Sequence, residues 1–200
     1  MPRPSISLTD FIDVVLKSGI PKATKVKQIK RRRKYTPGGD FYKRLRERII
    51  EVHTDGLDKK SLEQTLKIAH PTRKGHYKEA LKGYKKWWGN KEFEWVTPPR
   101  SNYNGRKIDV VVNPELGLAF KGKPHIVKLY FKADALKKNR AIHIYQMMEE
   151  TLRSIAPEGA VMCILDVKRG NLFTFNGPDT LVSATLKAEL AYIESIWESV

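Results

Sequence analysis

The chain has 200 residues, 40% of them hydrophobic, which is enough to bury the core of a domain of ordinary size. It contains no run of about eighteen apolar residues and no apolar export signal. We therefore expect a cytoplasmic protein without a membrane helix. Its single cysteine, Cys163, excludes an internal disulfide and a cysteine-rich zinc site.

The formal net charge of +16 is unevenly distributed along the chain. Residues 1–100 contain 25 Lys and Arg against 11 Asp and Glu, whereas residues 101–200 contain 13 against 11. Such an asymmetry predicts a polyanionic partner, first of all DNA or RNA. An anionic membrane surface and an acidic protein are lesser alternatives, and a basic protein without a polyanionic partner also stays open.

The N-terminal half is expected to be mainly helical. Its apolar residues recur at three- and four-residue spacing, with capping residues near the starts and Gly or Pro near the ends. The run Lys22–Lys34 interrupts this pattern with eight basic residues and no acid, which predicts a loop or a fraying arm. The predicted helices cover residues 7–19, 41–56, 61–69 and 76–88, and a short strand is expected around residues 93–96.

Two stretches of this half are candidates for nucleic-acid contacts. The basic run would clamp phosphates, although a solvated connector explains the same residues. The helix at 76–88 interleaves aromatic residues with lysines, which suits base stacking but also an ordinary core face with lysines in solvent. The candidate contacts are Lys30, Arg31, Arg32, Arg33, Lys34, Lys82, Lys85 and Lys86.

The C-terminal half is expected to contain a β-hairpin whose arms are Ile108–Val112 and His125–Lys132. The second arm alternates, so Val127, Leu129 and Phe131 should face the core. The opposite face, polar or solvated, would then carry Lys128, a further candidate phosphate contact, with Tyr130 and Lys132. Beyond the hairpin, a helix is predicted at 139–155, strands at 160–167 and 171–175, and a last helix from residue 178 or 179.

These elements predict an α+β protein in which a helical N-terminal half precedes a mixed β-sheet core with flanking helices. Residues 1–100 would form a basic helical region and residues 101–200 an α/β sheet domain. One compact unit is the alternative.

Over residues 105–175, the order helix, β-hairpin, helix, strand resembles the core of the PD-(D/E)XK nuclease superfamily, which implies a restriction-endonuclease-like fold. In the exonuclease branch a Gly-x-x-x-Asp-like strand supplies a metal-binding carboxylate, which Gly105 and Asp109 match here. The resemblance gives Glu115, after Pro114, as a second acid. The lysine of its acid-x-lysine motif would be Lys132, and the glutamine of the following helix would be Gln146.

The chain departs from this pattern in two places. Tyr130 stands where the family has an acid two residues before the lysine, and Glu150 stands where a tyrosine is expected four residues after the glutamine. Asp166 and Lys168 form a literal acid-x-lysine triplet with the residue between them, and they are the alternative site. The stretches VNPELGL and HIVKLYFK also resemble uncharacterised bacterial proteins, which implies no activity.

Three functions follow from these patterns. The preferred one is a nucleic-acid-binding protein whose nuclease-like core is degenerate, inactive and in no need of a cofactor. The second is a metal-dependent phosphodiesterase in which Asp109, with Glu115 or Asp166, holds Mg²⁺ or Mn²⁺ and Lys132 steadies the phosphate or the attacking water. The third is an adaptor subunit that binds an acidic protein.

Overall fold

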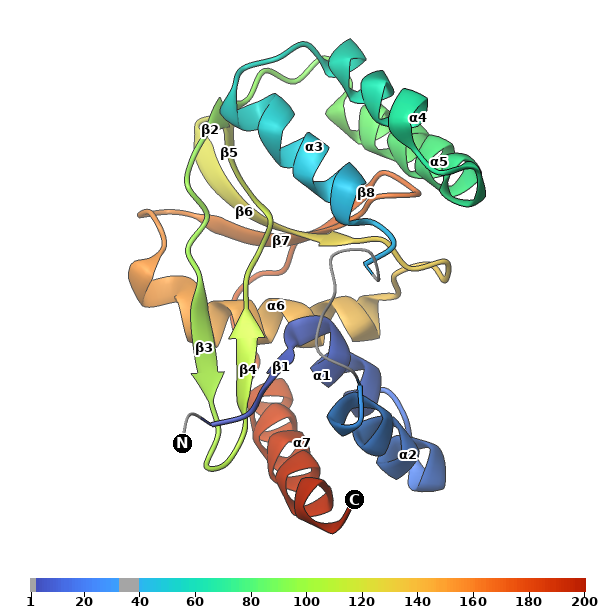
Figure 1. The fold of residues 1–200 in the computed structure, drawn as a ribbon. Helices are drawn as coiled ribbons and strands as arrows, with labels where there is room; N and C mark the ends of the chain where they lie inside the picture. Colours follow the sequence, from blue (N-terminus) through green and yellow to red (C-terminus); the bar gives the residue numbers. More distant parts are fainter. Residues whose placement is uncertain (1–2, 33–39) are drawn as a thin grey trace.

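The structure is a computed structural model that describes residues 3–32 and 40–200 (Figure 1). These residues form an α+β fold, as the sequence predicts. The α-helices are α1 (Leu8–Val15), α2 (Gly19–Lys30), α3 (Lys43–Thr54), α4 (Gln64–Ile68), α5 (Pro71–Trp88), α6 (Lys138–Leu152) and α7 (Thr180–Ser199), with 3₁₀ turns η1 (Lys59–Glu63) and η2 (Arg153–Ile155). The strands are β1 (Ser5–Ser7), β2 (Glu94–Trp95), β3 (Ser101–Asn104), β4 (Asp109–Val112), β5 (Leu116–Phe120), β6 (Lys123–Tyr130), β7 (Val161–Asp166) and β8 (Asn171–Phe173).

The strands are arranged in two sheets. The central sheet has the order β2-β5-β6-β7-β8, in which β6 and β7 are parallel and the other neighbours antiparallel. The chain passes from β6 to β7 through α6, as the connection of two parallel strands requires. The smaller sheet has the order β1-β4-β3, with β1 parallel to β4.

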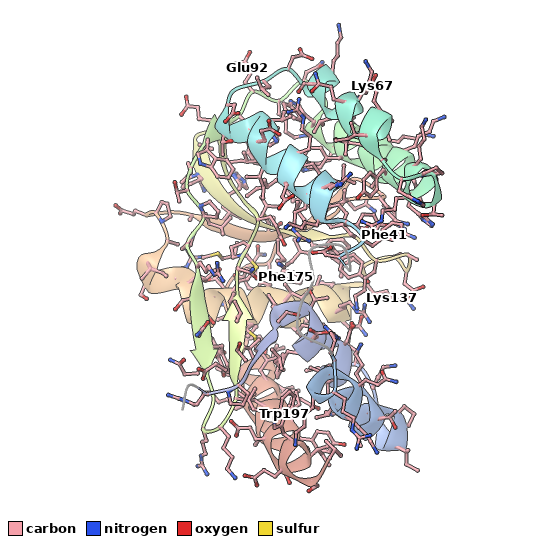
Figure 2. The ribbon with its side chains drawn as sticks, in the orientation of Figure 1. Phe41, Lys67, Glu92, Lys137, Phe175 and Trp197 are labelled. Carbon is pink, nitrogen blue, oxygen red and sulfur yellow. The ribbon has the colours of Figure 1, made fainter. Side chains whose placement is uncertain are left out.

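Helices cover both faces of the central sheet (Figure 1). On one face, Val127 and Leu129 of β6 pack with α3 and α5 in what we call the α5-side core. On the other, Ile126 and Tyr130 pack with α1, α6 and α7 in the α6-side core. Both cores combine residues from the two halves of the chain, and the domain boundary at residue 100 stays a prediction. Phe41 packs against the α5-side core, and Phe175 and Trp197 pack against the α6-side core (Figure 2).

The structure contains a β-hairpin that includes the predicted second arm, but the predicted first arm is not part of it. β6 pairs antiparallel with β5, and Leu116 lies opposite Val127. The turn between them contains Lys121 and Gly122, both at positive φ (53° and 71°), which is typical of the tight turns of two-residue hairpins. The expected first arm, β4, lies instead between β1 and β3 in the smaller sheet. The predicted connection between the two arms therefore contains a whole strand, β5, that the sequence analysis did not predict.

The expected solvated face of β6 is also wrong. The alternation itself is confirmed, because Val127 and Leu129 lie in the core. Lys128 and Tyr130, on the opposite face, are only 7% and 6% exposed. The physical reason is that α1 and α6 cover this second face. The alternating side chains of β6 therefore point into two buried cores, whereas one of the two faces was expected to contact solvent.

The basic run is helical over most of its length, contrary to the predicted loop. α2 begins at Gly19 and places Pro21 in its first turn, where a missing N–H group costs nothing. Val26 and Ile29, one turn apart, are buried and hold the helix against the α6-side core. The other predicted helices are present, with Ser7 and Asp179 as N-caps, although α1 already ends at Val15 and α5 already begins at Pro71. No helix among the described residues is long and apolar enough to cross a membrane.

Candidate functional site

The three carboxylates predicted to hold a metal lie in separate surroundings. Asp109, on the smaller sheet, lies 3.5 Å from the guanidinium of Arg3. Asp166, at the end of β7, is fully buried, and its Oδ2 accepts a hydrogen bond from the backbone N–H of Leu136. Glu115 precedes β5. Among the described residues, no hydrogen bond or ion pair joins these carboxylates to one another or to Lys132, and no three His, Cys, Asp or Glu side chains are placed to share a metal ion.

Glu115 and Lys128 form a buried ion pair across the β5–β6 hairpin. Their Oε1 and Nζ atoms are 2.7 Å apart, and the side chains are 11% and 9% exposed. Glu115 also accepts the N–H of Leu129 at 2.8 Å, and Lys128 also donates to the carbonyl of Asn113 at 3.1 Å. Lys128 is therefore occupied inside the protein, and its predicted role as an exposed phosphate contact is wrong.

The remaining predicted catalytic residues make structural contacts. Gln146 of α6 is buried, donates to Glu150, and accepts the N–H of Asp179 at the start of α7. This amide thereby joins two helices. Lys168, of the alternative triplet, pairs with Glu79 of α5 at 2.8 Å.

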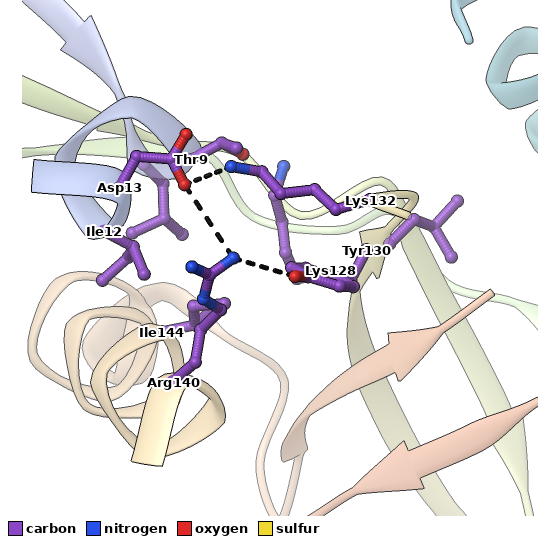
Figure 3. Close-up of a pocket in the computed structure, with 10 residues that line it drawn as sticks. Thr9, Ile12, Asp13, Lys128, Tyr130, Lys132, Arg140 and Ile144 are labelled. Carbon is purple, nitrogen blue, oxygen red and sulfur yellow. Dashed lines mark hydrogen bonds and ion pairs between the residues drawn. The ribbon is translucent and has the colours of Figure 1, made fainter. Parts of the chain in front are cut away.

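Lys132 lies in a small pocket between α1, α6 and the end of β6, which we call the Asp13 pocket (Figure 3). Its ammonium group pairs with the carboxylate of Asp13 on α1. The guanidinium of Arg140, on α6, is 3.9 Å from the same Asp13 oxygen, and Lys25 of α2 is 3.5 Å from the other. Three cations thus surround a single carboxylate.

Tyr130 links this pocket to the sheet. Its hydroxyl accepts a hydrogen bond of 2.8 Å from Nη1 of Arg140, whose guanidinium also lies over the ring at 5.8 Å (Figure 3). Burial raises the pKa of Tyr130, and the nearby carboxylates of Asp166 and Asp13 act in the same direction while Arg140 opposes them. The hydroxyl therefore keeps its proton at neutral pH.

The sequence offers little that would have identified this pocket. In the sequence, Asp13 is an ordinary acid near the start of a predicted helix and belongs to no motif. It is 119 residues from Lys132, and only the packing of α1 against the end of β6 brings the two together. Arg140 lies in a predicted helix but carries no motif.

The basic run makes mainly internal contacts in its described part. Arg32 binds both oxygens of Asp10 at 2.8 and 2.9 Å. Burial would raise the pKa of Asp10, but hydrogen bonds from Arg32 and Ser7 outweigh it and the pKa is lowered. Lys30 donates to the carbonyl of Trp197, whereas Arg31 is exposed. The candidates Arg33 and Lys34 lie outside the described residues.

The exposed side of α5 carries a row of lysines. Lys74, Lys78, Lys82 and Lys86 follow one another at four-residue spacing, all are exposed, and none has a side-chain partner among the described residues. Lys85 instead pairs with Glu63 at 2.6 Å. We call the four lysines the α5 lysine row. Lys67 of α4 lies at the outer end of the same helical layer (Figure 2).

The charge around this row is strongly one-sided. Between residues 59 and 91 the chain has ten Lys and Arg but only two Asp and Glu. Both acids, Glu63 and Glu79, are already paired with lysines. Comparison with known proteins does not assign this surface, since no known family's sequence model and no curated protein matches the chain.

Proposed function

We propose that the protein binds nucleic acid through the α5 lysine row and that its nuclease-like core is catalytically degenerate. The observation that carries the proposal is the row itself, with four exposed ammonium groups on one helix and no internal partners among the described residues. Unpaired lysines in an environment with few acids are the groups that displace counterions from a phosphate backbone. The proposal needs no cofactor.

The spacing of the row suits a phosphate backbone. Residues four apart rise by about 6 Å along a helix, so the four lysines span about 18 Å. A duplex of about five base pairs covers the same length at 3.4 Å per pair. Long, flexible lysine side chains can reach neighbouring phosphates over this distance without reading the bases, which favours binding without strong sequence preference.

The resemblance to PD-(D/E)XK nucleases supports a degenerate nuclease-like core. The hairpin of the family then corresponds to β5–β6, one strand later than the sequence analysis placed it. The β5–β6 hairpin, α6 and β7 follow in the expected order within one sheet. The residue that begins the hairpin is then Glu115 and not Asp109. Glu115 is engaged by Lys128, and Tyr130 stands in place of the second acid, so the residues favour binding over phosphodiester hydrolysis.

Salt dependence tests the binding surface. The native protein should bind a labelled duplex or single strand, and log–log plots of affinity against salt should have a steep slope. Replacement of the α5 lysine row by alanine should reduce this slope by roughly three to four units, since each phosphate contact adds about 0.7 to 0.9. A matched control replaces four exposed lysines on other elements, namely Lys123, Lys137, Lys138 and Lys187.

An equal loss in the two quadruple variants would mean that net charge and not the row drives binding. Absence of binding at low salt would refute the proposal and leave an acidic protein as the expected partner. The catalytic part is tested separately by incubating labelled substrates with Mg²⁺ or Mn²⁺. Metal-dependent cleavage that disappears in Glu115→Gln or Asp109→Asn would favour the metal-dependent phosphodiesterase instead.

A further inference from the structure

The Asp13 pocket contains more cationic hydrogen-bond donors than its carboxylate accepts. The guanidinium of Arg140 has five N–H groups. It donates one hydrogen bond to Tyr130, whereas its distance of 3.9 Å to Asp13 is too long for a hydrogen bond. The ammonium of Lys132 has three N–H groups and donates to one oxygen of Asp13. The pocket therefore offers unused donors from two different elements.

The charges around Asp13 also favour the binding of an anion. Lys25, Lys132 and Arg140 lie within ion-pair distance of Asp13, so three positive charges face one negative charge. The side chains of Lys132 and Arg140 are 31% and 23% exposed, which leaves them accessible to a small solute. Partial burial also makes their attraction for an anion stronger than on an open surface.

We propose that the Asp13 pocket binds one phosphate group and that Asp13 acts as the competing internal anion when the phosphate is absent. A phosphate has more acceptor oxygens than a carboxylate and a larger negative charge. The guanidinium fork of Arg140 matches two phosphate oxygens, and Lys132 approaches as a compact point charge. The protonated hydroxyl of Tyr130 is a further donor at the same place.

Two sources share this chemistry, namely free phosphate and a phosphate of a nucleic acid. The inference does not depend on the α5 lysine row, which lies on a different helix from every residue that lines the pocket. The row variant should therefore bind inorganic phosphate as the native protein does. Phosphate binding by the row variant therefore tests the Asp13 pocket independently of the proposal that the α5 lysine row binds nucleic acid.

The test is a calorimetric titration with inorganic phosphate, with sodium chloride adjusted to constant ionic strength. The native protein should show saturable binding, and Asp13→Asn should bind at least about tenfold more tightly, because the competing like charge is removed. Arg140→Gln and Lys132→Gln should each weaken binding about tenfold or more. Lys123→Gln, at the opposite end of β6, removes the same charge and should change nothing.

Circular dichroism without phosphate checks that each variant is folded, and Arg140→Lys replaces Arg140→Gln if the latter is not. Arg140→Lys keeps the charge but loses the fork, so it should also bind more weakly. The proposal is overturned if neither the native protein nor Asp13→Asn binds phosphate saturably. It is also overturned if replacing Arg140 and Lys132 leaves the affinity unchanged.

Oligonucleotides with a 5′-phosphate or a 5′-hydroxyl identify the source of the phosphate. Weaker binding of only the phosphorylated strand by the Arg140 variant would assign the pocket to a strand end. Weaker binding of both strands would assign it to an internal phosphodiester. If neither strand is affected while inorganic phosphate binding is lost, the ligand is free phosphate.

Discussion

The buried Lys128–Glu115 pair permits a sharp test of how the central sheet tolerates charge. In Lys128→Met, the carboxylate of Glu115 would stay buried with one remaining hydrogen bond, from the N–H of Leu129. Breaking a buried pair in this way typically costs about 3–5 kcal/mol, because the leftover charge has lost its partner but not its desolvation penalty. Methionine fills nearly the same volume, so little of this cost should come from a cavity.

The chain contains a matched control at the surface. Lys107 and Glu198 are 2.5 Å apart, but their side chains are 56% and 61% exposed. Lys107→Met should change the free energy of unfolding by no more than about 1 kcal/mol, as is usual for exposed pairs. The two variants remove the same group from pairs of similar length, and burial is the main difference between them.

Urea unfolding followed by circular dichroism measures both variants. The double variant Lys128→Met with Glu115→Gln should recover much of the loss, because it removes both charges and keeps an acceptor for the Leu129 N–H. Lys128→Met should also leave nucleic-acid affinity unchanged, since Lys128 does not face solvent. A cost for Lys128→Met no larger than that for Lys107→Met would refute the reasoning.

Three further predictions concern stability and are read from urea midpoints. Burial lowers the pKa of His53 to about 4 from 6.5, so the unfolded chain takes up its proton first as the pH falls. The free energy of unfolding should then drop by about 3 kcal/mol from above pH 6.5 to below pH 4, and much less in His53→Asn. Glu194 accepts two backbone N–H groups of the β3–β4 turn through one buried oxygen; Glu194→Ala should cost about 3 kcal/mol, and Glu194→Gln, which keeps an acceptor, clearly less. On α5, a Cβ on Gly83 would lie 2.2 Å from a backbone carbonyl of the β7–β8 turn, whereas one on Gly75 would meet nothing within 4 Å. Gly83→Ala should therefore destabilise by about 3 kcal/mol or more, while Gly75→Ala stabilises by about 0.5–1 kcal/mol; equal effects would contradict the packing of α5 on that turn.

The periodicity of hydrophobic residues predicted individual helices and strands well, because this pattern depends only on residues within the same element. The apolar run of β7 and the alternation of β6 are properties of a few neighbouring residues, and both strands are present. Asp179 and Ser7 cap helices through bonds to residues two or three positions away, so their role was also legible locally. Even the β5–β6 turn had a local signal that the sequence analysis did not use, namely Gly122, since glycine readily adopts the positive φ found at this position.

Pairing and solvent exposure depend on distant residues and were predicted poorly. The position of β4 between β1 and β3 depends on residues 5–7, which carry no strand pattern. Lys128 has the hydrophilic character of an exposed residue, but Glu115 neutralises it inside the protein. The Asp13 pocket is the extreme case, because its charges come from distant parts of the chain and only Lys132 among them belongs to a predicted motif.

The parallel pairing of β1 with β4 has a consequence for synthesis on the ribosome. Ser5 lies opposite Asp109, so the first strand meets its partner only after about a hundred further residues have been made. At roughly 5–20 residues per second, this takes about 5–20 s. During that time the apolar face of α1, with Leu8, Phe11 and Ile12, has not yet met β4, one of the elements that bury it. The apolar face of α1 accordingly stays without this partner for several seconds after it has been made.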